Sequence, residues 1–517
     1  MKTKLLLYVM CCFAMLSYSQ NTYVPDDNFE QALIALGYDT APLDDYIPTA
    51  NISSVTDLNL YNKGISDLTG IEDFTALNTL YCGNNNLTNL DISYNTSLQN
   101  LSCHANNLTS LNTSANTALT QLVCSYNNIS NLDLSNNVLL EYLNCEDNNL
   151  TVLNTLMNTA LTSLSCSNNP INNLDVSANT LLVSLDCSNS MISSLNISNN
   201  PLLISLSCYS NNISSLDVSN NTVLQALYCY SNSLSSLDVS ANTALRTLQF
   251  HNNNINAIDV SNNTALIYLY TSNNNISNLD ISKNIALIVL TCESNNLNSL
   301  DVSNNTLLEG LYCTDNSITT LDVSSNPNLD ALNCNYNNIV SLDISNNPKL
   351  KGLLCNTNNL ESLDISNNPN ITWFYCDNNN LSSLNVKNGN NINFNDFDAR
   401  NNPNLNCINV DDAIWSTANW TNIDSHSIFS EDCAALSIED LGASNFNIYP
   451  NPVNDLLTIN LNEKATFSLS NSNGQLLTKG VLYHGKNELN LSNLSSGFYF
   501  IKIKSADGIV TKKLIKL

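Results

Sequence analysis

The sequence predicts a solenoid of short parallel strands, followed by a small β-sandwich at the C-terminus. The first observation is the pattern L-x-x-L-x-C-x-x-N-x-L, which is first complete at residues 77–87 and occurs fifteen times at intervals of 21 residues. The second is that the sixth position of the pattern is Cys in thirteen of these copies. The third is that residues 446–517 lose this period and alternate apolar with polar residues, as strands do. A fixed period of this length is typical of stacked repeats.

Each repeat contains one short strand and one turn. Leu80 and Cys82 alternate with Thr79 and Tyr81, so a strand here points two side chains inward and the others outward. Strands of successive turns are expected to pair in parallel, about 4.8 Å apart. Asn85 follows where the chain leaves the strand, and an amide can bond backbone groups that would otherwise be buried unpaired. We expect this column of asparagines to hold the turns together.

The repeat pattern resembles that of leucine-rich repeat proteins over residues 55–405. The resemblance implies a leucine-rich repeat solenoid with a parallel β-sheet on its concave face and a short, irregular convex side. Because this scaffold hosts many functions, the resemblance leaves the ligand open.

The N-terminal residues are expected to contain a leader and a cap. Residues 1–19 carry two lysines, then an apolar run, then small residues, which is the pattern of a secretory signal peptide. Residues 20–54 should form an N-terminal helical cap, because the end of a solenoid exposes its core. A short helix with Phe29, Leu33 and Leu36 on one face would cover that end.

The far end of the solenoid is expected to carry a second cap and a disulfide. Residues 406–433 are too irregular for another repeat, and Cys407 and Cys433 lie outside the repeat register. Exported proteins can oxidise such a pair, which would stabilise the fold by about 3 kcal/mol. Two free thiols are the alternative. Residues 434–445 show no periodicity and are interpreted as a linker.

The thirteen cysteines of the repeats are expected to be buried, reduced thiols. A metal site would need paired ligands with histidine nearby, whereas each of these cysteines takes one inward position per turn, where Cys acts as a small apolar residue. We therefore predict no metal site and no cofactor. Phe250 and Thr271 replace Cys in adjacent turns and predict a local kink or a widening of the core. Ser190 replaces one of the turn asparagines with a shorter side chain.

The C-terminal region, residues 446–517, resembles the type A C-terminal sorting domain of the bacterial type IX secretion system. The residues that carry the resemblance are Tyr449, Pro450, Asn451, Pro452, Gly497, Tyr499, Lys512 and Lys513. The resemblance implies export across both membranes, the type IX secretion machinery as a partner, and a location outside the cell or on its outer surface. The alternative is a carbohydrate-binding or adhesive sandwich.

The charge of the chain narrows the classes of partner. The formal net charge is −27, with seven basic and forty acidic residues between 20 and 445, and eight lysines against four acids from 446 onward. A strongly acidic solenoid repels nucleic acid and anionic lipid, so neither is an expected partner. No stretch after the leader is apolar enough to span a membrane. We further expect the protein to be a monomer.

The sequence favours a binding protein over an enzyme. His104, His251, His426 and His484 are scattered, and no catalytic constellation or phosphate-binding loop accompanies them. The outward strand positions instead hold eleven of the 21 tyrosines of the chain. Tyr exposes a large apolar area with a polar tip, so we expect a patch that binds an extracellular protein or a glycan. Its predicted residues, clustered in six successive turns, are Tyr209, Tyr228, Tyr230, His251, Tyr268, Tyr270, Glu293 and Tyr312.

A column of Asp residues leaves a second function open. It is uninterrupted from Asp217 to Asp364, with Ser two residues and Asn four residues after most of its members. Stacked carboxylates repel one another, so something must offset the repulsion. Local hydrogen bonds to backbone N–H groups would suffice. The alternative is a structural or calcium-binding surface protein that bridges its turns with Ca²⁺.

Overall fold

The computed structural model describes residues 20–433, 446–505 and 508–517. Its contacts divide the chain into two units, one running to Asn406 and including Ile414–Ser427, the other comprising Cys407–Ala413 and Ile428–Leu517. The expected signal peptide at 1–19 and the expected linker at 434–445 lie outside the described residues.

The first unit begins with a small cap. β1 (Asn21–Tyr23) pairs antiparallel with β2 (Tyr46–Pro48), and the helices are α2 (Asp27–Ala35) and α3 (Thr49–Ile52). Asp26 caps α2, since its carboxylate accepts hydrogen bonds from the N–H groups of the next turn. Phe29 and Leu33 are fully buried, as the sequence predicts, but Leu36 is 44% exposed because the helix ends before it.

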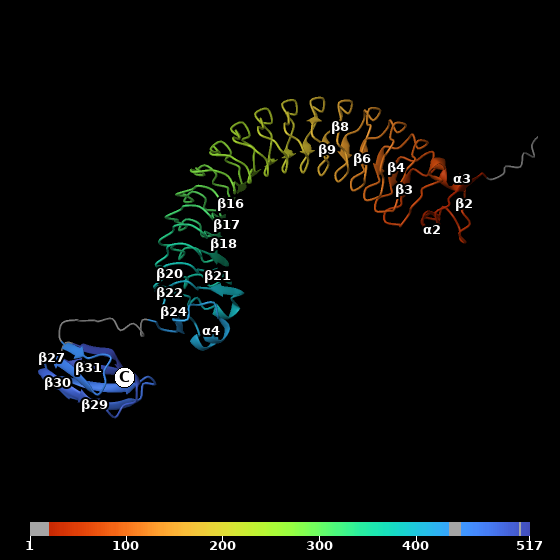
Figure 1. The fold of residues 1–517 in the computed structure, drawn as a ribbon. Helices are drawn as coiled ribbons and strands as arrows, with labels where there is room; N and C mark the ends of the chain where they lie inside the picture. Colours follow the sequence, from red (N-terminus) through yellow and green to blue (C-terminus); the bar gives the residue numbers. More distant parts are fainter. Residues whose placement is uncertain (1–19, 434–445, 506–507) are drawn as a thin grey trace, which may run out of the picture. The chain divides into compact units, whose positions relative to one another are not determined.

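Seventeen strands of the described residues form one long parallel sheet. In order they are β3 (Asp57–Asn59), β4 (Thr79–Tyr81), β5 (Asn100–Ser102), β6 (Gln121–Val123), β7 (Tyr142–Asn144), β9 (Ser163–Ser165), β11 (Ser184–Asp186), β12 (Ser205–Ser207), β13 (Ala226–Tyr228), β14 (Thr247–Gln249), β15 (Tyr268–Tyr270), β16 (Val289–Thr291), β17 (Gly310–Tyr312), β18 (Ala331–Asn333), β19 (Gly352–Leu354), β21 (Trp373–Tyr375) and β23 (Asp396–Asp398). Figure 1 shows that this sheet lines the inner side of the bend of the solenoid. The predicted solenoid with a sheet on its concave face is confirmed.

The opposite side of the solenoid is short and irregular. Its few strands pair in parallel, β8 (Leu153–Asn154) with β10 (Leu174–Asp175), and β20 (Ser362–Asp364) with β22 (Ser383–Asn385). Two single turns of 3-10 helix, η1 (Ile71–Asp73) and η2 (Asn391–Asn393), complete it.

The repeated columns of the sequence set the register and the core. Leu80 of β4 lies opposite Leu58 of β3 and Leu101 of β5, and Leu continues at this position in each strand of the sheet until Phe374 of β21 and Phe397 of β23 replace it. The thirteen repeat cysteines are buried and unpaired, as predicted. Burial raises the pKa of their thiols, to about 12 for Cys82, so they stay protonated and unreactive at neutral pH.

The turn asparagines bond to the backbone, as the sequence predicts. The amide of Asn85 donates to the carbonyls of Leu60 at 2.8 Å and Cys82 at 3.0 Å, and its oxygen accepts from the N–H of Ile65 at 3.0 Å. Ser190 has a shorter reach, since its hydroxyl donates to the carbonyl of Ser188 at 3.3 Å. The N–H of Ile171, which an Asn at 190 would bond, turns instead to the carbonyl of Asn169 at 2.8 Å.

The kink that we expected at Phe250 and Thr271 is absent, so this part of the prediction was wrong. Strands β13 to β16 pair without any break in register across these turns. Phe250 is fully buried, whereas Ile258 in the same turn is partly exposed, although the residues at its position in the adjacent turns, Leu237 and Leu279, are buried. Thr271 donates its hydroxyl to the carbonyl of Thr291 at 3.1 Å, which satisfies the polar group inside the core.

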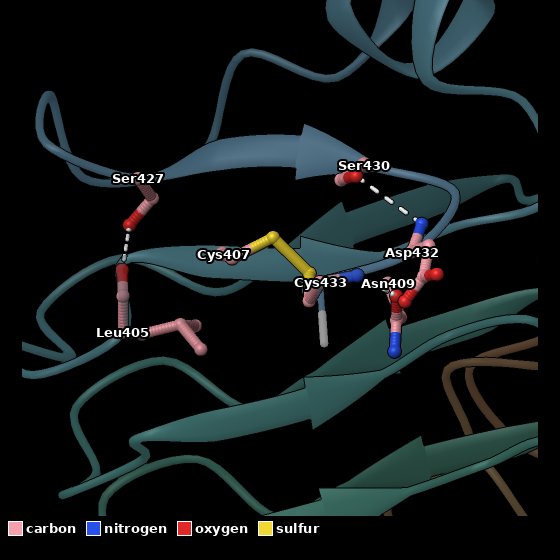
Figure 2. The surroundings of a disulfide bond; sticks show 7 residues. All are labelled: Leu405, Cys407, Asn409, Ser427, Ser430, Asp432 and Cys433. Carbon is pink, nitrogen blue, oxygen red and sulfur yellow. Dashed lines mark hydrogen bonds between the residues drawn. A yellow bond between two sulfur atoms is a disulfide. The ribbon is translucent and has the colours of Figure 1, made fainter. Parts of the chain in front are cut away.

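Residues 406–433 contain β24 (Cys407–Asn409), α4 (Ala413–Asn419) and β25 (Ile428–Ser430), with β24 and β25 paired in parallel. Cys407 and Cys433 form a disulfide with an S–S distance of 2.02 Å (Figure 2). The N–H of Cys433 donates to the side-chain oxygen of Asn409 at 2.8 Å, which holds the end of the segment next to β24.

The C-terminal residues form a sandwich of two antiparallel sheets. One sheet has the order β26 (Phe446–Tyr449), β27 (Leu456–Leu461) and β30 (Gly485–Asn490). The other has the order β29 (Leu476–Leu482), β28 (Ala465–Asn471), β31 (Gly497–Ser505) and β32 (Gly508–Lys516). Their inner faces share a core that includes Leu457, Ile459, Leu469 and Ile501. This agrees with the small sandwich that the sequence predicts.

Candidate functional site

The predicted patch lies on the outward face of β12 to β17 and on the residues shortly after these strands. Each strand points its middle residue inward, for example Leu227 and Leu269, which are fully buried. The flanking residues therefore face outward on the concave side. Of the predicted patch residues, Tyr268 is exposed and the other seven are half-buried against their neighbours.

Three of the predicted residues stack on one another. The ring centroids of Tyr209 and Tyr230 are 4.4 Å apart at an interplanar angle of 7°, and those of Tyr230 and His251 are 4.3 Å apart at 11°. In parallel strands in register, equivalent outward residues of neighbouring strands lie side by side at the distance between the strands, so successive rings at this position lie nearly parallel. The stack forms a continuous aromatic wall across three turns.

A second row of tyrosines runs beside this wall. Tyr228, Tyr270 and Tyr312 occupy the same strand position in every second turn, with Gln249 and Thr291 between them. Tyrosines at this spacing are about 10 Å apart. At one end of the row the ring of Tyr312 lies over Gly310, where an added Cβ would approach it to 3.0 Å.

The patch is electrically neutral apart from Glu293. Burial raises the pKa of Tyr230 to about 12, raises that of Tyr270 and lowers that of His251. These three side chains are therefore uncharged at pH 7. Burial also raises the pKa of Glu293, against a smaller opposing effect from a hydrogen bond to Ser272. The eight patch residues offer aromatic faces, hydroxyl groups and one carboxyl group.

The sequence analysis missed an exposed tryptophan on the same face. Trp373 is 47% exposed on β21, in the strand position that Tyr268 occupies five strands earlier in the sheet. Next to it, the hydroxyl of Tyr375 donates to Asp396 at 2.6 Å. Counting all aromatic residues, instead of tyrosine alone, at the outward positions would have revealed Trp373.

The Asp column is explained by local hydrogen bonds. In each of these turns one carboxylate oxygen accepts the N–H of the Ser two residues later, as with Asp217 and Ser219 at 2.9 Å. The Ser hydroxyl and N–H together lower the pKa of Asp217. The same bonds lower the pKa of Asp238, against a smaller opposing effect from the carboxylate of Asp217. These bonds favour the charged carboxylates and so act against the repulsion within the column. Among the described residues, three acidic side chains whose carboxylate oxygen atoms lie within 4.8 Å of one another are found in the N-terminal cap, at Asp27, Glu30 and Asp45.

The predicted sorting residues lie in the sandwich. The side chain of Asn451 joins the Tyr449–Pro452 segment to β32, because it donates to the carbonyl of Lys513 at 2.7 Å and accepts from the N–H of Ile515 at 2.8 Å. The ring of Tyr449 is 50% exposed, and that of Tyr499 is buried, with its hydroxyl donating to the carbonyl of Ser495 at 2.7 Å. Gly497 begins β31, and Lys512 and Lys513 lie in β32.

The solenoid has solved structural relatives. The functional domain of InlJ from Listeria monocytogenes, described as including a cysteine ladder, is 28% identical with a TM-score of 0.63, over 97% of this chain and all of that one. The leucine-rich repeat protein LIC12759 of Leptospira interrogans is 24% identical with a TM-score of 0.59, over 64% of this chain and 92% of that one. The latter similarity concerns the fold alone.

Two further matches come from sequence. Internalin J of Listeria monocytogenes serotype 4b is 41% identical over 78 residues, which is 15% of this chain and only 8% of internalin J. Residues 447–517 match the family described as the secretion system C-terminal sorting domain. In the described part of the chain, the helices are too short or too polar to cross a membrane. The sorting domain indicates export through type IX secretion to the cell surface or the extracellular space. The protein is thus a leucine-rich repeat solenoid with internalin structural neighbours, which carries a secretion system sorting domain at its C-terminus.

Proposed function

We propose that this exported protein binds another extracellular protein, or a glycan, through the tyrosine patch on its concave sheet, and that it has no catalytic activity. The observation that carries the proposal is the stack of Tyr209, Tyr230 and His251, whose rings lie 4.3 to 4.4 Å apart. Aromatic side chains lose little entropy on binding and bury large areas, which is why they anchor interfaces.

The charge of the patch supports a neutral or cationic partner. Its one carboxyl group is Glu293, and the outward positions aligned with it and with the patch tyrosines carry no Lys or Arg in the fifteen repeats. An anionic partner would meet no compensating charge there. The flat aromatic rings can also stack on the apolar faces of neutral sugars. The test must therefore include both proteins and glycans.

The test is a pull-down from extracellular material together with a glycan array, using the exported protein. Changing Tyr228, Tyr230 and Tyr270 together to Ser should remove the aromatic contacts and weaken binding at least tenfold, because each lost anchor costs more than about 1 kcal/mol. The melting temperature should change little, since the three rings are only half-buried.

Matched control tyrosines lie elsewhere on the solenoid. Tyr94, Tyr126 and Tyr336 are 68%, 54% and 55% exposed. Tyr126 and Tyr336 have a positive φ, which Ser also adopts at Ser210, so Ser is tolerated at this position. The control triple Ser variant should bind like the wild type. Full binding by the patch variant, or equal loss in both variants, would place the site elsewhere.

A further inference from the structure

The outer face of the four-stranded sheet in the sorting domain gathers lysines. Ser468 of β28 lies opposite Lys479 of β29 on one side and Lys502 of β31 on the other. Because residues directly opposite each other in antiparallel strands share a face, Lys479 and Lys502 point to the same side of the sheet. Lys504 follows two residues after Lys502 and therefore shares this face. Phe500, two residues before Lys502, lies on this face too, and Lys513 of β32 lies directly opposite Phe500 and therefore also points to this side of the sheet. We call Lys479, Lys502, Lys504 and Lys513 the basic face.

The basic face points away from the core. The alternate residues of the same strands, among them Phe467, Leu469, Ile501 and Ile503, are at most 8% exposed and form the inside of the sandwich. The four lysines themselves are all exposed. Strand alternation thus separates a buried apolar face from a charged outer one.

No carboxylate within the sheet neutralises these lysines. The four strands contain six lysines and neither Asp nor Glu. Within the described part of the sandwich, the ion pairs are formed by Lys486 with Glu488 and by Lys516 with Asp455, so the four lysines of the basic face take part in none. Like charges on one face of a sheet repel each other. The repulsion would be relieved by an acidic partner.

Apolar side chains lie between the charges. Phe498, Val481 and Ile509 of these strands are 52%, 46% and 52% exposed, and the Nζ atom of Lys513 lies 4.0 Å from the ring centroid of Phe498. Exposed aromatic and aliphatic groups among the charges are typical of protein interfaces. The rest of the chain, with a net charge of −33 between residues 20 and 445, is repelled by an anionic membrane.

We propose that the basic face is the surface through which the sorting domain docks on an acidic surface of a protein of the secretion machinery. The proposal rests on the export role of the domain and adds the face and the charge of the partner. Charge complementarity raises the rate of encounter, and the exposed apolar groups add contact area.

The experiment compares two charge reversals in the full-length protein, expressed in a bacterium that has type IX secretion. Lys502→Glu with Lys504→Glu alters the basic face, whereas Lys464→Glu with Lys486→Glu makes the same change of net charge elsewhere in the sandwich. The first variant should reach the cell surface or medium at least tenfold less than the wild type and accumulate in the periplasm. The second should be exported normally. Resistance of the periplasmic variant to protease shows that the sandwich is folded.

The remaining outcomes contradict the proposal in distinguishable ways. Normal export of the K502E and K504E variant, or an equal loss of export in both variants, would contradict docking through the basic face. Deletion of residues 446–517 is run alongside, and continued export of that protein would overturn the sorting role itself. The wild type should not sediment with phosphatidylglycerol vesicles. Sedimentation that K502E and K504E abolish would identify an anionic membrane as the partner instead.

Discussion

The inward and the outward positions of the solenoid differ in how strictly they repeat. Inside, the same residue types recur at each turn, because each turn must bond to and pack against the turns beside it. Outside, the strand positions of β13 to β17 depart from the repeat and gather Tyr228, Tyr230, Tyr268 and Tyr270. Nothing in the packing of a turn requires these rings. The comparison shows that the repeat describes the scaffold, while the departures from it on the concave face are the positions at which we propose that a partner binds.

Two buried asparagine columns show how closely the interior is constrained. The column of Asn85 uses both its amide donors and its oxygen. In the second column, Asn242 donates to the carbonyls of Val218 and Asn221 at 2.9 Å each, but its oxygen is buried without a partner. In twelve asparagines of this column, Asn242 included, the side-chain oxygen is buried without a hydrogen-bond donor. The oxygen of Asn137, by contrast, accepts a hydrogen bond from the hydroxyl of Thr113 at 2.8 Å. The turn column is therefore the stronger of the two.

The largest effect on stability is expected from breaking the turn column. In Asn274→Ala the carbonyls of Phe250 and Thr271 lose a donor, and the buried N–H of Ile255 loses its acceptor at 2.9 Å. Unsatisfied buried groups of this kind should lower the free energy of unfolding by roughly 3 kcal/mol. Urea denaturation measures it, with Asn275→Ala as the control, since Asn275 is exposed in the same turn. Equal stability of the two variants would contradict the assigned role.

The reverse change at Ser190 should have the opposite sign and a smaller size. Ser190→Asn supplies the donors and the acceptor that this turn lacks, and we expect a gain of about 1 kcal/mol in the same measurement. An unchanged or lowered unfolding midpoint would count against the column as the source of stability.

The smallest effect at neutral pH is expected from the Asp column. Asp217, Asp238 and Asp259 have a lowered pKa because Ser hydroxyl and N–H groups bond to their carboxylates. A pKa lowered by folding stabilises the protein above the ordinary value of 3.8, and this contribution is lost as the pH falls through the folded pKa. The triple Asp→Asn variant lacks this contribution, so it should melt slightly below the wild type at pH 7 and lose less stability below about pH 4, where the two proteins should converge.

Asn is a matched replacement because it already occupies this column. Asn112 accepts the N–H of Ser114 at 3.1 Å, in the same geometry as Asp. Melting curves from pH 7 to pH 3 measure the contribution of the Asp–Ser hydrogen bonds to stability, and the same curves with and without EDTA measure any contribution of bound calcium. The same acid sensitivity in both proteins would rule out the Asp–Ser bonds as its source, and a lower melting temperature in EDTA would restore the calcium alternative.

The sequence predicted the features that depend on repetition and missed those that depend on side-chain conformation. Register, the inward cysteines and the bonding of Asn85 follow from spacing alone. The second buried column was missed because Asn221 lies four residues after Asp217, in what reads as an exposed turn motif. The kink at Phe250 was wrongly predicted because residue volume does not reveal how neighbours adjust.

For the proposed patch, too, the sequence predicted the positions of the residues but not the conformations of their side chains. The positions of the patch residues on the outward face follow from strand alternation, but the stacking of Tyr230 on His251 depends on side-chain rotamers, which a repeat pattern does not specify. Trp373 was missed because the count considered only one residue type.

The most direct test of the account is hydroxyl-radical footprinting of the exported protein with and without a partner captured by it. If the concave patch is the binding surface, Tyr228, Tyr230 and Tyr268 should be protected from oxidation in the complex. Tyr94 and Tyr336, which are 68% and 55% exposed, should be oxidised equally in both states. Protection of Tyr94 or Tyr336, with the patch tyrosines unchanged, would contradict the account and place the partner away from the patch.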